Sequence, residues 1–295
     1  MGRVIQPQQA GPHRSVGERG TVIAESDSIR AEGARVIAVV NQKGGVGKTT
    51  TAVNLAASIA VAERPVLLID LDPQANASSA YGIAEPAVQL YDVLSGDASL
   101  PRATTPTELG HLHLVPAGPD LAGAEIELVT AEARESRLRH ALVEVRAHYD
   151  FVIIDCPPSL GLLTLNALSA SNSVLIPLQC EYYALEGLAR LLDTIERVRA
   201  AFHHPLELEG VVLTMVDRRA NLSRQVEAEA RRHFAEQVFD TVIPRNVRLS
   251  EAPSHGKPIL LYDIASRGAR AYLDLAAELM TRHPGASCKP PALPH

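Results

Sequence analysis

The sequence of 295 residues contains no tryptophan, and aromatic residues make up only 4% of it. It contains only three cysteines. Proteins that read single-stranded nucleic acids stack bases on aromatic side chains, so this shortage argues against base-specific recognition of that kind. Cys156, Cys180 and Cys288 are too few and too widely spaced for a disulfide framework or a zinc site. These absences leave the charged and glycine-rich segments as the places to look for function.

Long apolar runs are absent as well. No segment approaches the roughly 18 apolar residues that a membrane-spanning helix needs, and the N-terminal region lacks the apolar stretch of a secretion signal. An N-myristoylation motif would start at Gly2 and would need serine or threonine at position 6, where this sequence has Gln6. The formal net charge of −6 excludes a chain coated in basic charge, although it leaves room for a local basic face. We expect a cytoplasmic protein.

Short β-branched runs alternate with longer amphipathic stretches between two loose ends. Residues 1–33 and the proline-rich 283–295 are expected to be flexible, with one domain over 34–282. Strands are expected over 35–41, 65–71, 112–116, 151–156, 173–179, 210–215 and 241–243, and helices over 48–61, 132–147, 162–170, 184–201, 222–236 and 267–281. This alternation predicts an α/β protein with a single doubly wound, mostly parallel sheet flanked by helices.

A glycine-rich loop follows the first expected strand and opens the first expected helix. It reads Gln42-Lys43-Gly44-Gly45-Val46-Gly47-Lys48-Thr49-Thr50-Thr51. Glycines allow successive backbone N–H groups to turn toward phosphates, and the positive end of the helix adds to the attraction. A lysine at the position of Lys48 reaches the β- and γ-phosphates, and a hydroxyl at the position of Thr49 binds Mg²⁺. The segment therefore predicts a P-loop that binds a nucleotide with Mg²⁺.

Aspartates stand at the ends of two strand candidates. Asp70 and Asp72 follow the run 66–69, and Asp155 follows 151–154. Ligands of doubly wound sheets bind beyond the carboxyl ends of the strands, which is where these carboxylates are placed. Asp155 is interpreted as the Walker B carboxylate that holds Mg²⁺ through a water molecule, with Thr49 and Asp72 as the other metal-side residues. For Asp70 two interpretations are open. It supports the ligands around Mg²⁺ or the Thr49 side chain, or it only caps a helix.

The loop departs from the general pattern G-x-x-x-x-G-K-[ST], because Gln42 replaces the first glycine and Lys43 follows it. The form K-G-G-x-G-K-[ST]-T resembles the deviant Walker A loop of the ParA/MinD superfamily of P-loop ATPases. Further segments resemble the chromosomal ParA (Soj) partition ATPases, and the resemblance covers about Arg35 to Met280. They are DLDPQANASS (70–79), DCPPSLG (155–161), QCEYYALEG (179–187), LTMVD with NLS (213–217 and 221–223), and IPRNVRLSEAPS with GKP (243–254 and 256–258).

The resemblance implies a cycle driven by ATP with Mg²⁺. It implies that Lys43 crosses a dimer interface to touch the other subunit's phosphates and that Asp72 orients the attacking water. It places the adenine near Met215, Pro244 and Asn246. It further implies that ATP joins two chains into a sandwich homodimer, which binds double-stranded DNA without sequence preference and coats the nucleoid. A ParB-type centromere-binding partner would stimulate a weak basal hydrolysis, and the cycle would segregate a chromosome or plasmid.

Arginines are concentrated in the second half of the chain. Between Asp217 and Arg248 there are seven arginines and five acidic residues. Arg219 occupies the place of an arginine that contributes to DNA binding in Soj-like proteins, and Arg218 and Arg248 are the other DNA-binding candidates. Dimerisation doubles the number of phosphate contacts, which gives a physical reason for ATP-gated DNA binding. The alternative is that the helix over 222–236 has an ordinary solvated face of mixed charge.

Three related functions share parts of this pattern. A MinD-like ATPase acting on a membrane would need a C-terminal amphipathic helix with a basic polar face, whereas 269–281 is typical of a core-packing helix. A ParA-like ATPase that positions another cargo would differ only in its partner. A nitrogenase-like iron protein would need two cysteines placed to hold a cluster across the dimer, and Cys156 and Cys180 do not match that placement. We expect no membrane partner.

Overall fold

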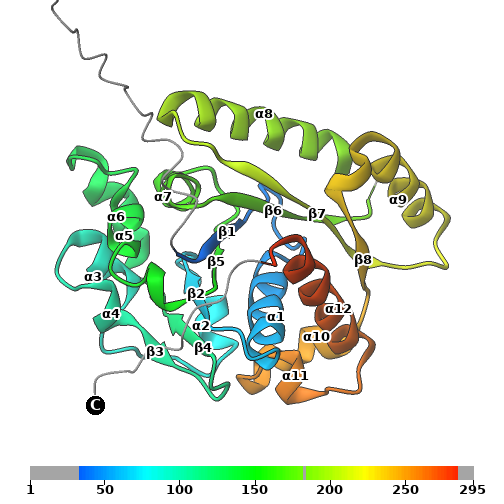
Figure 1. Ribbon diagram of the computed structural model, residues 1–295, viewed down its shortest axis with the longest axis horizontal. Helices are drawn as coiled ribbons and strands as arrows, with labels where there is room; N and C mark the ends of the chain where they lie inside the picture. Colours follow the sequence, from blue (N-terminus) through cyan, green and yellow to red (C-terminus); the bar gives the residue numbers. More distant parts are fainter. Residues whose placement is uncertain (1–32, 182–183, 285–295) are drawn as a thin grey trace, which may run out of the picture. The chain divides into compact units, whose positions relative to one another are not determined.

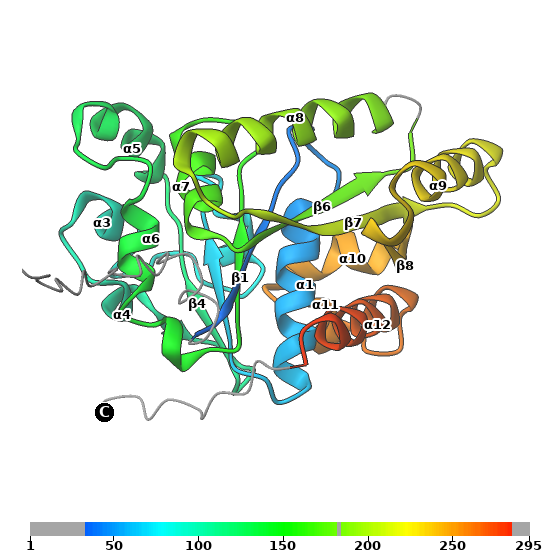
Figure 2. The ribbon, with the colours of Figure 1, turned by 45° about the horizontal axis from the view of Figure 1, so that its top comes forward.

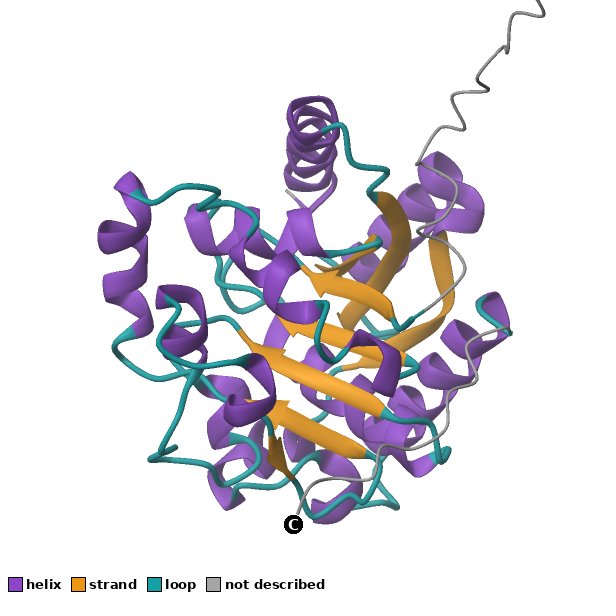
Figure 3. Cartoon of the chain, turned by 60° about the vertical axis from the view of Figure 1, so that its left-hand side comes forward, coloured by secondary structure: helices purple, strands orange, loops and turns teal. Residues whose placement is uncertain are grey.

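The computed structural model describes residues 33–181 and 184–284. The expected arm up to residue 32, most of the expected tail, Cys288 and the pair 182–183 lie outside the described residues. The described chain is built on an eight-stranded sheet with helices on both faces (Figure 1). Figure 3 shows the strands running side by side between the two layers of helices. The predicted fold class is confirmed.

The strands pair in the order β3-β4-β2-β5-β1-β6-β7-β8. All neighbours are parallel except β3 and β4, which pair antiparallel at one edge. Because β2, β5 and β1 are adjacent and parallel, their carboxyl ends meet at one edge of the sheet. The strands are β1 (Arg35–Val39), β2 (Val66–Asp70), β3 (Thr105–Pro106), β4 (Leu112–Val115), β5 (Phe151–Asp155), β6 (Ser173–Gln179), β7 (Glu207–Val216) and β8 (Val238–Pro244).

Helices connect the strands, except between β3 and β4, and follow the last strand. They are α1 (Lys48–Val61), α2 (Asn76–Ser79), α3 (Leu90–Ser95), α4 (Leu100–Ala103), α5 (Leu121–Glu127), α6 (Arg137–Leu142), α7 (Leu162–Ala170), α8 (Ala184–Phe202), α9 (Asn221–Phe234), α10 (Val247–Glu251), α11 (Ile259–Tyr262) and α12 (Arg267–Arg282). Short 3₁₀ helices follow some of them: η2 (Leu128–Thr130), η3 (Arg146–His148), η4 (Ala235–Gln237) and η5 (Ala252–His255).

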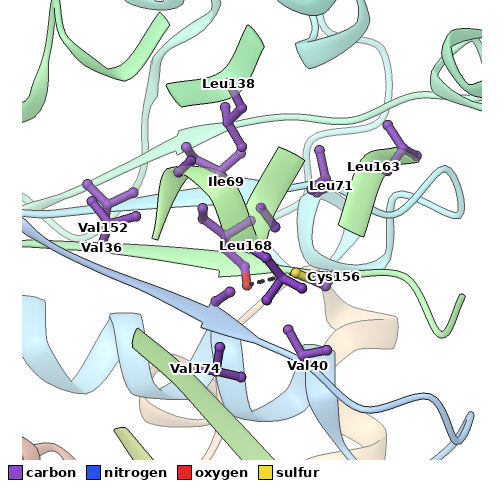
Figure 4. Packing of buried hydrophobic residues seen from close by; sticks show 14 of the residues in the cluster. Val36, Val40, Ile69, Leu71, Leu138, Val152, Cys156, Leu163, Leu168 and Val174 are labelled. Carbon is purple, nitrogen blue, oxygen red and sulfur yellow. Dashed lines mark hydrogen bonds between the residues drawn. The ribbon is translucent and has the colours of Figure 1, made fainter. Parts of the chain in front are cut away.

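Two hydrophobic cores lie on opposite faces of the sheet, since successive side chains of a strand point to opposite sides. Val36 and Ala38 of β1 belong to the core under α3–α9, whereas Ile37 and Val39 belong to the core under α1, α2 and α10–α12. Figure 4 shows part of the first core, where the Cys156 thiol donates to the Ile154 carbonyl at 3.8 Å. Cys156 thus packs as a small buried side chain.

Helix α1 lies against the sheet and beside α12 (Figure 2). It has the predicted bounds, and small residues such as Ala52 and Ala56 allow it to be buried along most of its length. The hydroxyls of Thr51 and Tyr272 lie 3.2 Å apart within this contact. Because α1 is held between the sheet and α12, the glycine-rich loop at its start is fixed at the carboxyl end of β1.

Three expected elements were wrong in extent, and one of them is the short strand expected over 241–243, which is the longer β8 (Val238–Pro244). The helix expected over 132–147 is reduced to α6 and η3, because Ala133 has a left-handed φ of 49° and the Asn166 side chain donates to the Arg134 carbonyl at 2.8 Å. The strand expected to begin at Gly210 begins at Glu207 instead. Gly210 lies inside it, where a β-carbon would come within 2.6 Å of the Phe239 ring. Only glycine allows this close approach of β7 and β8.

Candidate functional site

The glycine-rich loop curves around the side chain of Lys48. Gly45 and Gly47 have φ angles of 75° and 90°, a left-handed region that favours glycine. The Thr214 hydroxyl donates to the Val46 carbonyl at 2.8 Å, which ties the loop to the end of β7. Lys48 is buried, and its Nζ donates to the Lys43 carbonyl at 3.2 Å. The ammonium group therefore spans the inside of the loop, at the position where P-loops bind phosphate oxygens.

Two opposing effects act on the pKa of Lys48. Burial lowers the pKa of Lys48, whereas the nearby carboxylates of Asp155 and Asp72 act to raise it. The lysine thus depends on these two acidic neighbours for compensation of its charge. An anionic ligand in the loop would add to that compensation, because an opposite charge within a few ångströms favours the ionised form.

The predicted aspartates come together at the carboxyl ends of β2 and β5. Asp70 and Asp155 are directly opposite each other in the parallel register. Both are fully buried, and neither oxygen of Asp155 accepts a hydrogen bond of normal geometry from the described residues. Burial and the neighbouring Asp70 raise the pKa of Asp155 well above its usual value, against the opposing effects of Thr49 and Lys48. A buried carboxylate without partners is costly unless a cation or donor completes it.

This donor set fits Mg²⁺ delivered with a nucleotide. Within the described ranges, no three histidine, cysteine or acidic side chains form a ready-made metal site. Mg²⁺ prefers hard oxygen ligands and is usually held by one or two protein groups together with phosphates and waters. The Thr49 hydroxyl and the unpartnered Asp155 oxygens are ligands of that kind. Asp72 also lies close enough to affect the charge of both Lys48 and Asp155.

Asp72 and Asp70 have different surroundings. Asp72 is mostly buried, and its Oδ1 accepts the Gln74 N–H at 3.0 Å, whereas no hydrogen bond to its Oδ2 occurs among the described residues. Asp70 accepts three hydrogen bonds, from the Asp72 backbone and from the backbone and hydroxyl of Ser78. Burial raises the pKa of Asp70 to about 6 in spite of the bonds from Ser78. Asp70 thus anchors a loop, and Asp72 keeps one oxygen available.

Lys43 lies at the exposed edge of the same loop. Its ammonium forms an ion pair with Glu181, and its backbone N–H donates to the Asn41 side chain at 3.0 Å. Both partners of the ion pair are exposed, with side-chain exposures of 57% for Lys43 and 44% for Glu181. Exposed pairs contribute at most about 1 kcal/mol, so this one can open at little cost. The Lys43 ammonium can therefore exchange Glu181 for another anionic group.

A small cavity of about 140 Å³ adjoins the loop on the side of β7 and β8. It brings together the three residues expected near the adenine, Met215, Pro244 and Asn246, with Gly47 and Thr50 of the loop. Met215 has a left-handed φ of 51°, uncommon for a residue with a side chain. The cavity is also lined by Leu249, Ser250 and Tyr272. Their local sequence did not predict this position, because only the tertiary structure brings α10 and α12 next to the glycine-rich loop.

A larger cavity of about 790 Å³ lies between the β7–α9 connection, β8 and the start of α12. It is lined by five arginines (Arg218, Arg219, Arg245, Arg267 and Arg270) and three aspartates (Asp217, Asp240 and Asp274). Among the described residues, none of these five guanidinium groups forms an ion pair or a side-chain hydrogen bond. Since the arginines outnumber the aspartates, the cavity presents an excess of positive charge to an anionic ligand.

The structure separates the three predicted DNA-binding arginines. Arg218 and Arg219 line the basic cavity, whereas Arg248 lies outside it and pairs with Glu251 at 2.9 Å and Asp263 at 3.4 Å. Arg267 and Arg270 were not expected, because the helix that carries them was interpreted only as core packing. Their spacing of three residues, which places them on one face of a helix, was a usable indication.

No helix in the described ranges is long and apolar enough to cross a membrane. The residues predicted to bind the nucleotide gather at one edge of the sheet, and the basic cavity lies beside β8. In Figure 1, α9, β8 and α12 lie at the opposite end of the sheet from α3–α6.

Comparisons with known proteins agree on the family that this chain resembles. A family model described as an AAA domain matches residues 34–208. The chain is 58% identical over 250 residues to the chromosome partitioning protein ParA of Myxococcus xanthus, which covers 84% of this chain and 88% of that protein. It is 57% identical over 247 residues to the sporulation initiation inhibitor protein Soj of Bacillus subtilis, covering 83% of this chain and 98% of that protein.

Solved structures resemble the fold closely. A cobyrinic acid a,c-diamide synthase from Mycobacterium smegmatis, crystallised with an ATP analog and magnesium, has a TM-score of 0.75 and 38% identity, covering 87% of this chain and 98% of that one. The cell division ATPase MinD of Pyrococcus furiosus has a TM-score of 0.72 and 28% identity, covering 84% of this chain and 99% of that one.

Proposed function

The chain belongs to the ParA/Soj family of chromosome-partitioning ATPases, and we propose that it binds DNA as an ATP-bound homodimer and leaves DNA when ATP is hydrolysed. The observation that carries this proposal is the combination of the buried Lys48, the glycine-rich loop and the unpartnered carboxylate of Asp155 at one sheet edge. A triphosphate would compensate the charge of Lys48 and accept hydrogen bonds from the loop, and Mg²⁺ would compensate the charge of Asp155. A related structure of 38% identity binds an ATP analog with magnesium. The ATPase domain would span residues 34–282.

Nucleotide binding would use the loop from Lys43 to Thr50. Gly44, Gly45, Val46 and Gly47 would offer backbone N–H groups to the phosphates, and Lys48 would contact the β- and γ-phosphates. Thr49 and Asp155 would hold Mg²⁺, with Asp72 nearby. The cavity lined by Met215, Pro244 and Asn246 would take the adenine. The metal, when bound, neutralises charge that develops on the phosphates.

Hydrolysis would depend on Asp72 and on Lys43 of the other subunit. Asp72 has one side-chain oxygen held by Gln74 and the other available, which suits a group that orients a water molecule. Lys43 would leave Glu181 and cross to the partner's phosphates, where a positive charge stabilises the transition state as an arginine finger does. Since each subunit supplies one lysine, the reaction would require the dimer.

DNA binding would use the basic cavity. Arg218 and Arg219 have no acidic partner among the described residues, and Arg245, Arg267 and Arg270 add to the same surface. Arg248 would contribute only after its two ion pairs open. Contacts to phosphates carry no sequence information, so the binding would be sequence-independent. Two cavities in a dimer would double the contacts, so that ATP occupancy would control the affinity for double-stranded DNA.

A ParB-type partner would stimulate hydrolysis and couple the cycle to chromosome or plasmid segregation, so the protein would be cytoplasmic and associated with the nucleoid. This part of the proposal is supported by the relatives, a chromosome partitioning protein and a Soj protein. A MinD-like function on a membrane is the competing hypothesis. Incubation with anionic lipid vesicles and ATP separates the two, because only a membrane-acting ATPase would sediment with the vesicles.

Light scattering with saturating ATP, Mg²⁺ and the hydrolysis-blocking variant Asp72→Ala tests the central step. We expect the molecular mass to double with ATP and to stay that of a monomer with ADP, and we expect retention on DNA only in the first condition. The Lys43→Ala variant should bind ATP without doubling in mass. An Asp72→Ala protein whose mass does not change with ATP would refute the proposed switch.

A further inference from the structure

The loop that carries Asp72 is anchored by a second aspartate. Asp70, the last residue of β2, accepts the Asp72 N–H on Oδ1 at 3.2 Å. Its Oδ2 accepts the backbone N–H of Ser78 at 2.8 Å and the Ser78 hydroxyl at 2.7 Å. One carboxylate thus holds both ends of the segment from Asp72 to Ser78.

The Ser78 hydroxyl extends this anchor to the neighbouring strand. While it donates to Asp70, its Oγ accepts the backbone N–H of Ala117 at 3.0 Å. Ala117 follows β4, which pairs with β2. Ser78 is fully buried, so water cannot replace these bonds. A single hydroxyl therefore connects the Asp72 loop to the ends of two adjacent strands.

The buried Asp70 carboxylate constrains the conformation of the Asp72–Ser78 segment, because the hydrogen bonds from this segment offset the free-energy cost of burying the carboxylate. An ionised carboxylate away from water costs several kcal/mol unless hydrogen bonds satisfy it. Every hydrogen bond that the Asp70 carboxylate accepts from the described residues comes from the Asp72–Ser78 segment. The loop also contains Ala75 in a left-handed conformation with φ of 51°, which needs support from its surroundings. The carboxylate and the hydroxyl together select one backbone position for Asp72.

We propose that Ser78 is a positioning residue for ATP hydrolysis: through Asp70 it fixes the backbone of Asp72, and so the place of the carboxylate that orients the attacking water. This inference rests on the role proposed above for Asp72. Because displacing a catalytic group by about 1 Å can reduce a rate by about 100-fold, loss of this anchor affects turnover more than binding. The phosphate loop lies on other elements, so the affinity for ATP is unaffected.

Two variants of equal size test the proposal in the full chain. Ser78→Thr keeps the hydroxyl and Ser78→Val replaces it with a methyl group of the same shape, so both add the same volume at a buried site. Single-turnover hydrolysis with Mg²⁺ and ATP gives the rate, and titration with a fluorescent ATP analog gives the affinity. We expect the Val variant to be at least about tenfold slower than the Thr variant at equal affinity for ATP. The Val variant should also melt at a lower temperature, because Asp70 and the Ala117 N–H lose a buried hydrogen-bond partner.

Equal rates for the two variants, or a difference in affinity alone, would overturn the proposal. If the Val variant does not fold, Ser78→Ala against wild type gives the same comparison without added volume. Asp72→Ala separates this inference from the proposed function. A wild-type rate in Asp72→Ala removes the role of Asp72 itself, whereas a slow Asp72→Ala beside equal Thr and Val rates removes only the role of Ser78. A double variant of Asp72→Ala and Ser78→Val should be no slower than Asp72→Ala.

Discussion

Substitution of Arg219 by alanine should change the salt dependence of DNA binding by a predictable amount. Arg219 lines the basic cavity, and its guanidinium has no acidic partner among the described residues. A protein that neutralises phosphates releases counterions, and the logarithm of its affinity falls with the logarithm of salt concentration by about 0.9 per phosphate. A dimer contains two copies of Arg219. The variant should therefore have a slope smaller in magnitude by about 1.8.

This slope has a measurable consequence. Between 0.05 and 0.2 M salt, a fourfold rise, the wild-type dimer should lose about 12-fold more affinity than the Arg219→Ala dimer, since 4 raised to the power 1.8 is about 12. Fluorescence anisotropy with a labelled DNA duplex and ATP, in the hydrolysis-blocked background, measures the affinity at each salt concentration. Two unrelated duplex sequences should give the same slopes.

Arg232→Ala is the matched control. Arg232 lies on the nearby helix α9 but pairs with Glu229 across one helical turn, so it has no uncompensated charge to offer. Its removal should leave the slope within experimental error of the wild type. An unchanged slope in Arg219→Ala, or an equal reduction in Arg232→Ala, would show that the basic cavity does not contact phosphates.

Three further predictions concern binding and stability. Lys48→Ala should lower the affinity for an ATP analog by at least about 100-fold, because it removes the main phosphate contact. Lys43→Ala should lower the affinity far less. Similar losses in the two variants would refute the role of Lys48 as the main phosphate contact. Although burial acts to raise it, bonds from neighbouring donors lower the pKa of Glu209 from 4.5 to about 2. This depressed value stabilises the folded state above pH 4.5 by about 3 kcal/mol, a contribution lost between about pH 4.5 and 2. Denaturant titrations should thus separate wild type from Glu209→Gln at pH 7 but not near pH 2, and a constant difference would contradict this. Gly82→Ala and Gly256→Ala both place alanine at a positive φ, costing about 1 kcal/mol each. Gly256→Ala should cost more, because only its β-carbon would lie 3.0 Å from the other glycine's Cα, and equal unfolding midpoints would refute this reasoning.

The sequence determined the parts of the site that are contiguous in the chain. The loop from Lys43 to Thr50 could be interpreted without the fold, because glycines, a lysine and hydroxyls at fixed spacing predict a phosphate site. Helices α1 and α7 have their predicted bounds for a similar reason, since their apolar pattern and their flanking glycines are local. The parallel sheet followed from the alternation of strand and helix patterns.

Only the tertiary structure decided which distant residues meet and which charges remain unpaired. Asp70 is opposite Asp155 because β5 inserts between β1 and β2, and no local pattern encodes that strand order. Arg248 looked as basic as Arg219 in the sequence, yet the fold pairs Arg248 with Glu251 and Asp263. The expected helix over 132–147 is interrupted because the Asn166 side chain of α7 donates a hydrogen bond to one of its carbonyl groups, that of Arg134. Hydrogen bonds and ion pairs depend on distances of a few ångströms, and residues far apart in sequence acquire such distances only when the sheet assembles.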